Sequence, residues 1–110
     1  MSRLKPAMDW RSFIRDEIAA QAYEISLHAD DERLAEQLTV AEVEALLTGC
    51  EVLEDYPEDP RGHSCLALGF TPEVRPVHVV CGRNSLAHLV WITVYVPAMP
   101  KWRNARTRNR

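Results

Sequence analysis

Along the first half of the chain, apolar residues recur at spacings of three and four, the period of a helix buried on one side. This pattern predicts one helix from Met8 to about Ala22. It predicts a second helix from about Ser26 to Leu38, where the Ser26 hydroxyl can accept a bond from an unpaired first-turn amide. The buried side of this second helix is expected to consist of Leu27, Leu34 and Leu38.

A third helix is predicted by the run from Thr39 to Glu42, which has the form of a capping box. Gly49 is expected to end this helix in a left-handed conformation, which glycine adopts without steric cost. The inner face of the helix is predicted to contain Val40, Val43, Leu46 and Leu47.

After Gly49 the hydrophobic period changes to two, which indicates β-strands. Strands are predicted at 51–56, 64–70, 77–81 and 89–96. The connections between them are short and turn-like, which favours antiparallel neighbours. We therefore expect an α+β fold in which two to three N-terminal helices pack on a four-stranded antiparallel sheet.

The alternation of side chains along a strand also predicts which residues share a face of the sheet. Val77 and Val79 are expected on one face, with His78 on the other. In the last strand, Tyr95 is expected on the same face as Trp91.

The chain has 110 residues, of which 46% are hydrophobic and 26% charged, and this composition fits one globular domain. No apolar run approaches the roughly 18 residues of a membrane span, so we expect a cytoplasmic protein with no membrane partner. The three cysteines, Cys50, Cys65 and Cys81, form no CxxC motif and are read as small buried thiols.

Charge is distributed unevenly along the chain. Residues 1–60 hold 15 acidic against 5 basic residues, whereas residues 61–110 hold one acidic against 8 basic residues. The last ten residues contain five cations, Lys101, Arg103, Arg106, Arg108 and Arg110. Such a tail attracts phosphates through counterion release, but a solvated chain end has the same composition.

Several short segments, taken in order and with their spacing, resemble the domain of unknown function 4258 family. They are Ser26–Ala29, Arg33–Leu34, Leu38–Thr39, Glu42–Val43, Gly49, Glu54–Pro57, Asp59, Leu66–Gly69, Arg75–Val80, Thr93–Pro97 and Lys101–Trp102. The resemblance covers about residues 23–103, which we read as a single α+β domain. It leaves 1–22 as an N-terminal helical extension and 104–110 as a basic C-terminal tail.

More distantly, the chain resembles the RelE-like and BrnT-like ribonuclease toxins, in which helices precede an antiparallel sheet. This resemblance implies a RelE-like toxin-type architecture, RNA as substrate, an antitoxin-like protein as partner and cleavage without a metal ion. A non-catalytic module that binds protein or nucleic acid is the alternative, because one fold hosts many functions.

Metal-free RNA cleavage needs a base, an acid and a cation that stabilises the phosphorane. His28 lies in the first turn of a predicted helix, where the positive helix end favours a neutral ring that can act as a base. The candidate catalytic residues are His28, Arg33, His78 and Tyr95. The candidate substrate-binding residues are Arg75, Lys101 and Trp102, in which a lysine beside an aromatic ring can clamp and stack a base.

All of these candidates except Arg75 also have a structural alternative. His28 can bond neighbouring backbone, and Arg33, about 140° round the helix from His28, can pair with a nearby acid. His78 can be a satisfied core residue and Tyr95 a packing residue. Lys101 and Trp102 can simply anchor the C-terminus.

Metal and cofactor sites are not expected. His63 and Cys65 can share a strand face, but their spacing fits no standard zinc pattern. The chain has no phosphate-binding glycine loop, dinucleotide fingerprint or nucleophile elbow.

Overall fold

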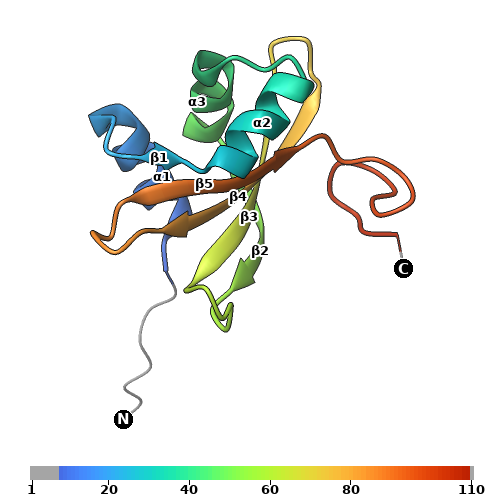
Figure 1. Cartoon of the computed structure of the whole chain (residues 1–110). Coiled ribbons are helices and arrows are strands. Elements are labelled where there is room, and N and C mark those ends of the chain that lie inside the picture. Colours follow the sequence, from blue (N-terminus) through green and yellow to red (C-terminus); the bar gives the residue numbers. More distant parts are fainter. Residues whose placement is uncertain (1–7, 110) are drawn as a thin grey trace.

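The computed structural model describes residues 8–109, so residues 1–7 of the predicted N-terminal extension and Arg110 of the basic tail lie outside the described residues. The elements are α1 (Trp10–Ala20), β1 (Glu24–Ile25), α2 (Leu27–Ala35), α3 (Val40–Thr48), β2 (Glu51–Tyr56), β3 (Ser64–Phe70), β4 (Pro76–Arg83) and β5 (Leu89–Tyr95). The predicted α+β class is confirmed (Figure 1).

The sheet has five strands in the order β1-β5-β4-β3-β2. Strands β2 to β5 form the expected antiparallel meander. The expectation of four strands was incomplete, because β1 pairs with β5 in parallel at the edge of the sheet. Two residues are too few to show a hydrophobic period, so no sequence pattern marked this strand.

The local signals for the helix starts are confirmed. The Ser26 hydroxyl accepts a hydrogen bond from the Ala29 amide at 3.0 Å, and Thr39 and Glu42 form the predicted capping box. The predicted conformation of Gly49 was wrong. Its φ is −113°, so α3 ends there without a left-handed residue.

One face of the sheet, here called the helix face, packs against α1 and α3. The buried core on this face contains Trp10, Ile14, Ile18, Val43, Leu46, Leu47, Cys65, Ala67, Val77, Val79, Cys81, Trp91 and Val94. The three cysteines are buried and unpaired, as predicted. Helix α1, which precedes the segments that carried the family resemblance, contributes three of these core side chains.

Helix α2 lies against the edge of β5 beyond β1. Ser26 donates from its backbone amide to the Trp91 carbonyl and from its hydroxyl to the Ile92 carbonyl. Glu32 accepts from the Val94 amide at 2.8 Å. Polar groups of α2 therefore cap a sheet edge.

This position explains why part of the predicted buried side of α2 was wrong. Leu27 is 86% exposed and Leu34 is 58% exposed, whereas Leu38 is buried. The helix docks on the strand edge mainly through Ala29 and through its polar bonds to β5. The spacing of its apolar residues therefore does not predict which side of the helix is buried.

The opposite face of the sheet, here called the tail face, is covered by residues 97–109, the C-terminal segment. Leu66, Leu68, His78 and Trp102 are all buried there. In Figure 1 this segment, coloured orange to red, curls back after β5 on the side of the molecule away from α1. An isolated bridge between Trp102 and Arg108 closes the segment into a loop.

Tyr95 lies on the tail face, so the prediction that it shares a face with Trp91 was wrong. Tyr95 pairs with His78 across the strands, whereas Trp91 pairs with Cys81 on the helix face. A register shift between Val80 and Cys81 separates the two pairs. An irregularity of this kind reverses the alternation of faces along the strand.

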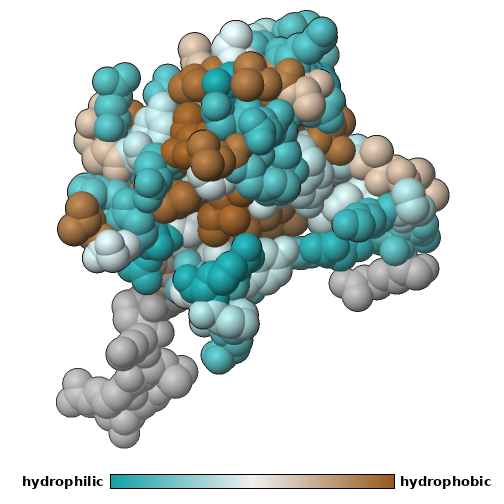
Figure 2. Space-filling model, viewed as in Figure 1, coloured by the Kyte–Doolittle hydropathy of each residue, from teal (hydrophilic) through white to brown (hydrophobic). Residues whose placement is uncertain are grey.

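The surface is of mixed polarity in the view of Figure 2, with apolar atoms interspersed among polar ones over the helices. No helix within residues 8–109 is long and apolar enough to cross a bilayer.

Candidate functional site

A cavity of about 540 Å³ lies where α2, the end of β5 and the C-terminal segment meet. Its lining residues are His28, Glu32, Thr93, Tyr95, Lys101, Trp102 and Arg108. Four of the seven candidate residues from the sequence are therefore brought together, from segments more than sixty residues apart in the chain.

His28 is positioned by the first turn of α2, which the Ser26 cap fixes against β5. Its side chain is 68% exposed, and its Nε2 lies 3.3 Å from Oε1 of Glu32. In the imidazolium form of His28 this contact is an ion pair. Glu32 is itself held by the Val94 amide, which fixes the pair relative to β5.

His78 is completely buried beneath the cavity and does not line it. Its Nε2 lies 2.7 Å from the Ala105 carbonyl oxygen, and its Nδ1 lies 3.0 Å from the Tyr95 hydroxyl. Its ring also meets Trp102 edge-on. The two histidines thus do not face one another across an open groove, and His78 matches its structural alternative, a satisfied buried residue.

Burial is the main cause that lowers the pKa of His78, and the hydrogen bond to the Ala105 carbonyl opposes it. The ring is therefore neutral at pH 7. Because the Ala105 carbonyl can only accept, Nε2 carries the proton and Nδ1 is the acceptor. The Tyr95 hydroxyl must then donate to Nδ1.

The proton of Tyr95 is consequently not available to a ligand. Burial is the largest cause that raises the pKa of Tyr95, and the neighbouring Trp102 side chain acts in the opposite direction. A catalytic role in which Tyr95 donates its proton to a substrate phosphate does not fit this arrangement.

Two cations, Lys101 and Arg108, come to the cavity from the C-terminal segment. Arg108 makes two hydrogen bonds of 2.8 Å to the carboxylate of Glu54, and its guanidinium lies 4.6 Å from the centre of the Trp102 ring. The bond to Glu54 is the largest cause that raises the pKa of Arg108, which remains charged. Trp102 is only 3% exposed under this cover, so the ring is not open for a base to stack on it.

Arg33 and Arg75 lie away from the cavity, and both have structural partners; only the pairing of Arg33 with a nearby acid was expected from the sequence. Arg33 bonds Asp30 at 2.8 Å and the Leu38 carbonyl at 3.1 Å. Arg75 bonds both the carbonyl and the carboxylate of Glu36. These contacts tie the C-terminal end of α2 to its surroundings.

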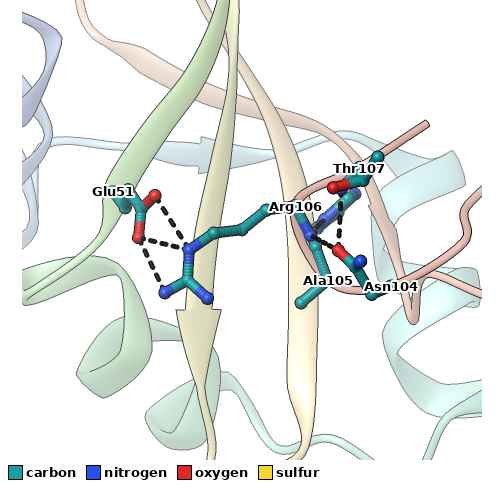
Figure 3. A network of polar contacts seen from close by, with 6 residues as sticks. Glu51, Asn104, Ala105, Arg106 and Thr107 are labelled. Atoms are coloured by element: carbon teal, nitrogen blue, oxygen red, sulfur yellow. Dashed lines mark hydrogen bonds and ion pairs between the residues drawn. The ribbon is translucent and has the colours of Figure 1, made fainter.

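Basic residues of the C-terminal half pair with acidic residues of the N-terminal half within the molecule. Arg106 makes three contacts of about 3 Å with the carboxylate of Glu51 and lies over the Phe70 ring. Figure 3 shows this side chain reaching across the sheet to Glu51, while the Asn104 side chain accepts from the amides of Arg106 and Thr107. The basic tail is thus bound to the acidic strand β2.

Three cavity residues were not singled out in the sequence. Glu32 stands four residues after His28, a spacing that brings two side chains together on a helix and could have identified the pair. Thr93 shares the face of Tyr95 in the last strand. Arg108 was noted only as one of the tail cations, because nothing local predicts how a loop folds back.

The weaker metal hypothesis finds no support in the placement of its residues. The Nε2 atom of His63 lies 2.5 Å from the carboxylate of Asp55. The same carboxylate accepts a hydrogen bond from the Trp10 indole. Cys65 is buried on the helix face beside Cys81. Within the part of the chain that the structure describes, no three His, Cys, Asp or Glu side chains are grouped so as to hold a metal ion.

Comparison with known proteins identifies a family. No curated protein and no solved structure matches the chain, so nothing found there supports a relation to the RelE-like or BrnT-like toxins. One family model does match, over residues 25–96, well over half of the chain. That range runs from β1 to just past β5 and includes His28, Glu32, Thr93 and Tyr95. The chain belongs to the family described as domain of unknown function (DUF4258).

Proposed function

We propose that the protein binds RNA at the cavity between α2 and the C-terminal segment and cleaves it without a metal ion, as a ribonuclease of the toxin type. The observation that carries this proposal is the convergence of His28, Glu32 and Lys101 on one cavity. A histidine backed by a carboxylate, beside two cations, provides proton transfer and phosphate stabilisation in one place.

The chemistry follows from which groups can still donate. In the proposed reaction the ribose 2′-oxygen attacks the adjacent phosphorus, loses its proton to water, and the bond to the 5′-oxygen breaks. Since the proton of Tyr95 is engaged by His78, the proton for the leaving 5′-oxygen comes from the imidazolium form of His28. Lys101 and Arg108 stabilise the charge on the phosphorane. The products are a 2′,3′-cyclic phosphate and a 5′-hydroxyl.

The test is RNA cleavage in excess chelator by the wild type and His28→Asn. General acid catalysis contributes about 10²- to 10⁴-fold, so the variant should lose at least about a hundredfold in rate. The matched control is His88→Asn, because His88 also pairs with a glutamate, Glu17, but lies in the turn before β5 and does not line the cavity. An absence of cyclic-phosphate products, or equal rates for the two variants, would refute the proposal.

A second candidate is a binding module without catalysis, and two observations favour it. Arg106 and Arg108, which approach the sheet from the tail, both pair with carboxylates of β2, and this pairing weakens their attraction for RNA. Leu27 and Leu34, seven residues apart, are exposed on one side of α2 and offer an apolar surface to an antitoxin-like protein.

Expression in bacteria separates the two candidates. A toxin should arrest growth when produced alone, and His28→Asn should relieve the arrest. A binding module should leave growth unchanged whether or not His28 is present.

A further inference from the structure

The Tyr95 hydroxyl acts as a hydrogen-bond donor inside the protein, and its capacity to accept a hydrogen bond is left unused. The hydroxyl donates its proton to Nδ1 of His78. A phenolic oxygen can accept two hydrogen bonds in addition to its one donation. Tyr95 lines the cavity, and its hydroxyl can accept a hydrogen bond from a ligand but has no proton left to donate.

The remaining cavity side chains define what kind of ligand matches this acceptor. Lys101 and Arg108 attract an anion, whereas Glu32, like Tyr95, presents an acceptor. A phosphodiester alone has only acceptor oxygens at neutral pH, so it satisfies the cations but not Tyr95. A ligand that carries a hydroxyl next to a phosphodiester satisfies both.

We propose that the Tyr95 oxygen accepts a hydrogen bond from the ribose 2′-hydroxyl, so that the site selects RNA over DNA, and that His78 is the positioning residue that keeps Tyr95 in this acceptor role. The inference rests on the proposed function, because it names how the same cavity recognises its substrate. In the bound substrate this bond points a lone pair of the 2′-oxygen toward the phosphorus, and the 2′-proton leaves Tyr95 for water as the oxygen attacks.

The C-terminal segment determines this recognition although it lies outside the family match at 25–96. Its Ala105 carbonyl fixes the tautomer of His78, and its Trp102 ring packs edge-on against the same imidazole. If Ala105 moved away, the proton of His78 could shift to Nδ1, and Tyr95 would become a donor to the cavity. Substrate preference is therefore coupled to the docking of the segment on the tail face.

The first test uses the ligand and not the protein fold. The affinity of His28→Asn, which prevents turnover, is measured for short oligonucleotides in the presence of chelator. The oligonucleotides differ at one sugar only, which is ribose, 2′-deoxyribose or 2′-fluororibose. A 2′-fluorine can accept but not donate. The ribose form should bind about tenfold more tightly than both others, a factor typical of one buried hydrogen bond.

The second test removes the acceptor. In Tyr95→Phe, on the same His28→Asn background, RNA affinity should fall to that of DNA while DNA affinity stays within about twofold. His78→Asn retains an acceptor near the position of Nδ1 and should keep much of the ribose preference, whereas His78→Leu should abolish it. Circular dichroism confirms that each variant is folded.

The outcomes distinguish this inference from the function on which it rests. If RNA is neither bound nor cleaved, the proposed function fails. If RNA is bound and cleaved but 2′-fluoro and ribose forms bind equally, or if Tyr95→Phe keeps the preference for ribose, the role of Tyr95 and His78 is overturned and the proposed function stands.

Discussion

The helix face and the tail face of the sheet are buried in different ways. On the helix face, α1 and α3 cover the strands with aliphatic and aromatic side chains that bury almost no polar groups. On the tail face, the C-terminal segment covers Leu66 and Leu68 but also His78, and it is held by Arg106–Glu51 and Arg108–Glu54 pairs. The comparison indicates that the helix face provides stability, whereas the tail face carries the directed polar groups that a binding site needs.

The largest expected effect is on the helix face. Leu47 is fully buried between α3 and the sheet, so Leu47→Ala should lower the free energy of unfolding by about 2–5 kcal/mol. Leu27→Ala is the matched control, since Leu27 is 86% exposed on α2, and it should change stability by less than about 0.5 kcal/mol. Denaturant unfolding measures both. Similar losses in the two variants would contradict this division of the molecule.

The next effect concerns how closely α3 approaches β3. A Cβ added at Gly69 would lie 2.5 Å from the backbone oxygen of Leu46, which cannot rotate away. Gly69→Ala should therefore cost about 1–3 kcal/mol of unfolding free energy, as overpacked cores do.

Gly49 provides the control for this substitution. A Cβ there meets no atom within 4 Å, and its φ of −113° suits any residue. Gly49→Ala should unfold at the same denaturant concentration as the wild type or slightly above it. A loss at Gly49 as large as that at Gly69 would show that the close packing of α3 is not the cause.

An intermediate effect is a pH dependence that arises on the tail face. Burial lowers the pKa of His78 in the folded protein below the ordinary value of 6.5. The unfolded chain therefore takes up the proton first as pH falls, so stability is complete above about pH 6.5 and decreases from there down through the folded pKa. The slope of unfolding free energy against pH should be shallower in His78→Asn. Identical slopes would mean that His78 is not buried as a neutral ring.

The smallest effect on stability is expected from the ion pair of Arg106 and Glu51, whose side chains are both about half exposed. Such a pair contributes about 0–1 kcal/mol, so Glu51→Gln should hardly change the unfolding midpoint. It should instead accelerate amide hydrogen exchange in the C-terminal segment, including at Arg103, whose amide bonds the Thr107 carbonyl.

Salt and a second ion pair test the cause of that change. High salt should reproduce the effect of Glu51→Gln in the wild type. Asp16→Asn removes an exposed pair with Arg15 on α1 and should leave exchange in the segment unchanged. Unaltered exchange in Glu51→Gln would show that the pair does not hold the segment to β2.

Elements specified by local chemistry were predictable from the sequence. The Ser26 cap, the capping box of Thr39 and the period-two strands depend on neighbours within a few residues. Features set by tertiary context were not predictable. The exposure of Leu27 follows from the docking of α2 on a strand edge, and the face of Tyr95 follows from a register shift against β4.

The candidate site likewise has features that the sequence predicts and features that it does not. His28, Tyr95 and Lys101 could be named from residue type and position, and the structure brings them to one cavity. The burial of His78 depends on how the C-terminal segment folds back, which no periodicity or motif encodes. The direction of the hydrogen bonds at Tyr95 depends on the Ala105 carbonyl, a backbone atom that any residue type would supply.

The central claim, that the tail face carries the binding site, is tested most directly by chemical-shift mapping with a ribodinucleotide on His28→Asn. The account predicts shifts at the backbone amides of Thr93, Tyr95 and Lys101 and at the Trp102 indole, with α1 and α3 unchanged. Shifts confined to α1 and α3, or no shift at millimolar ligand, would contradict it.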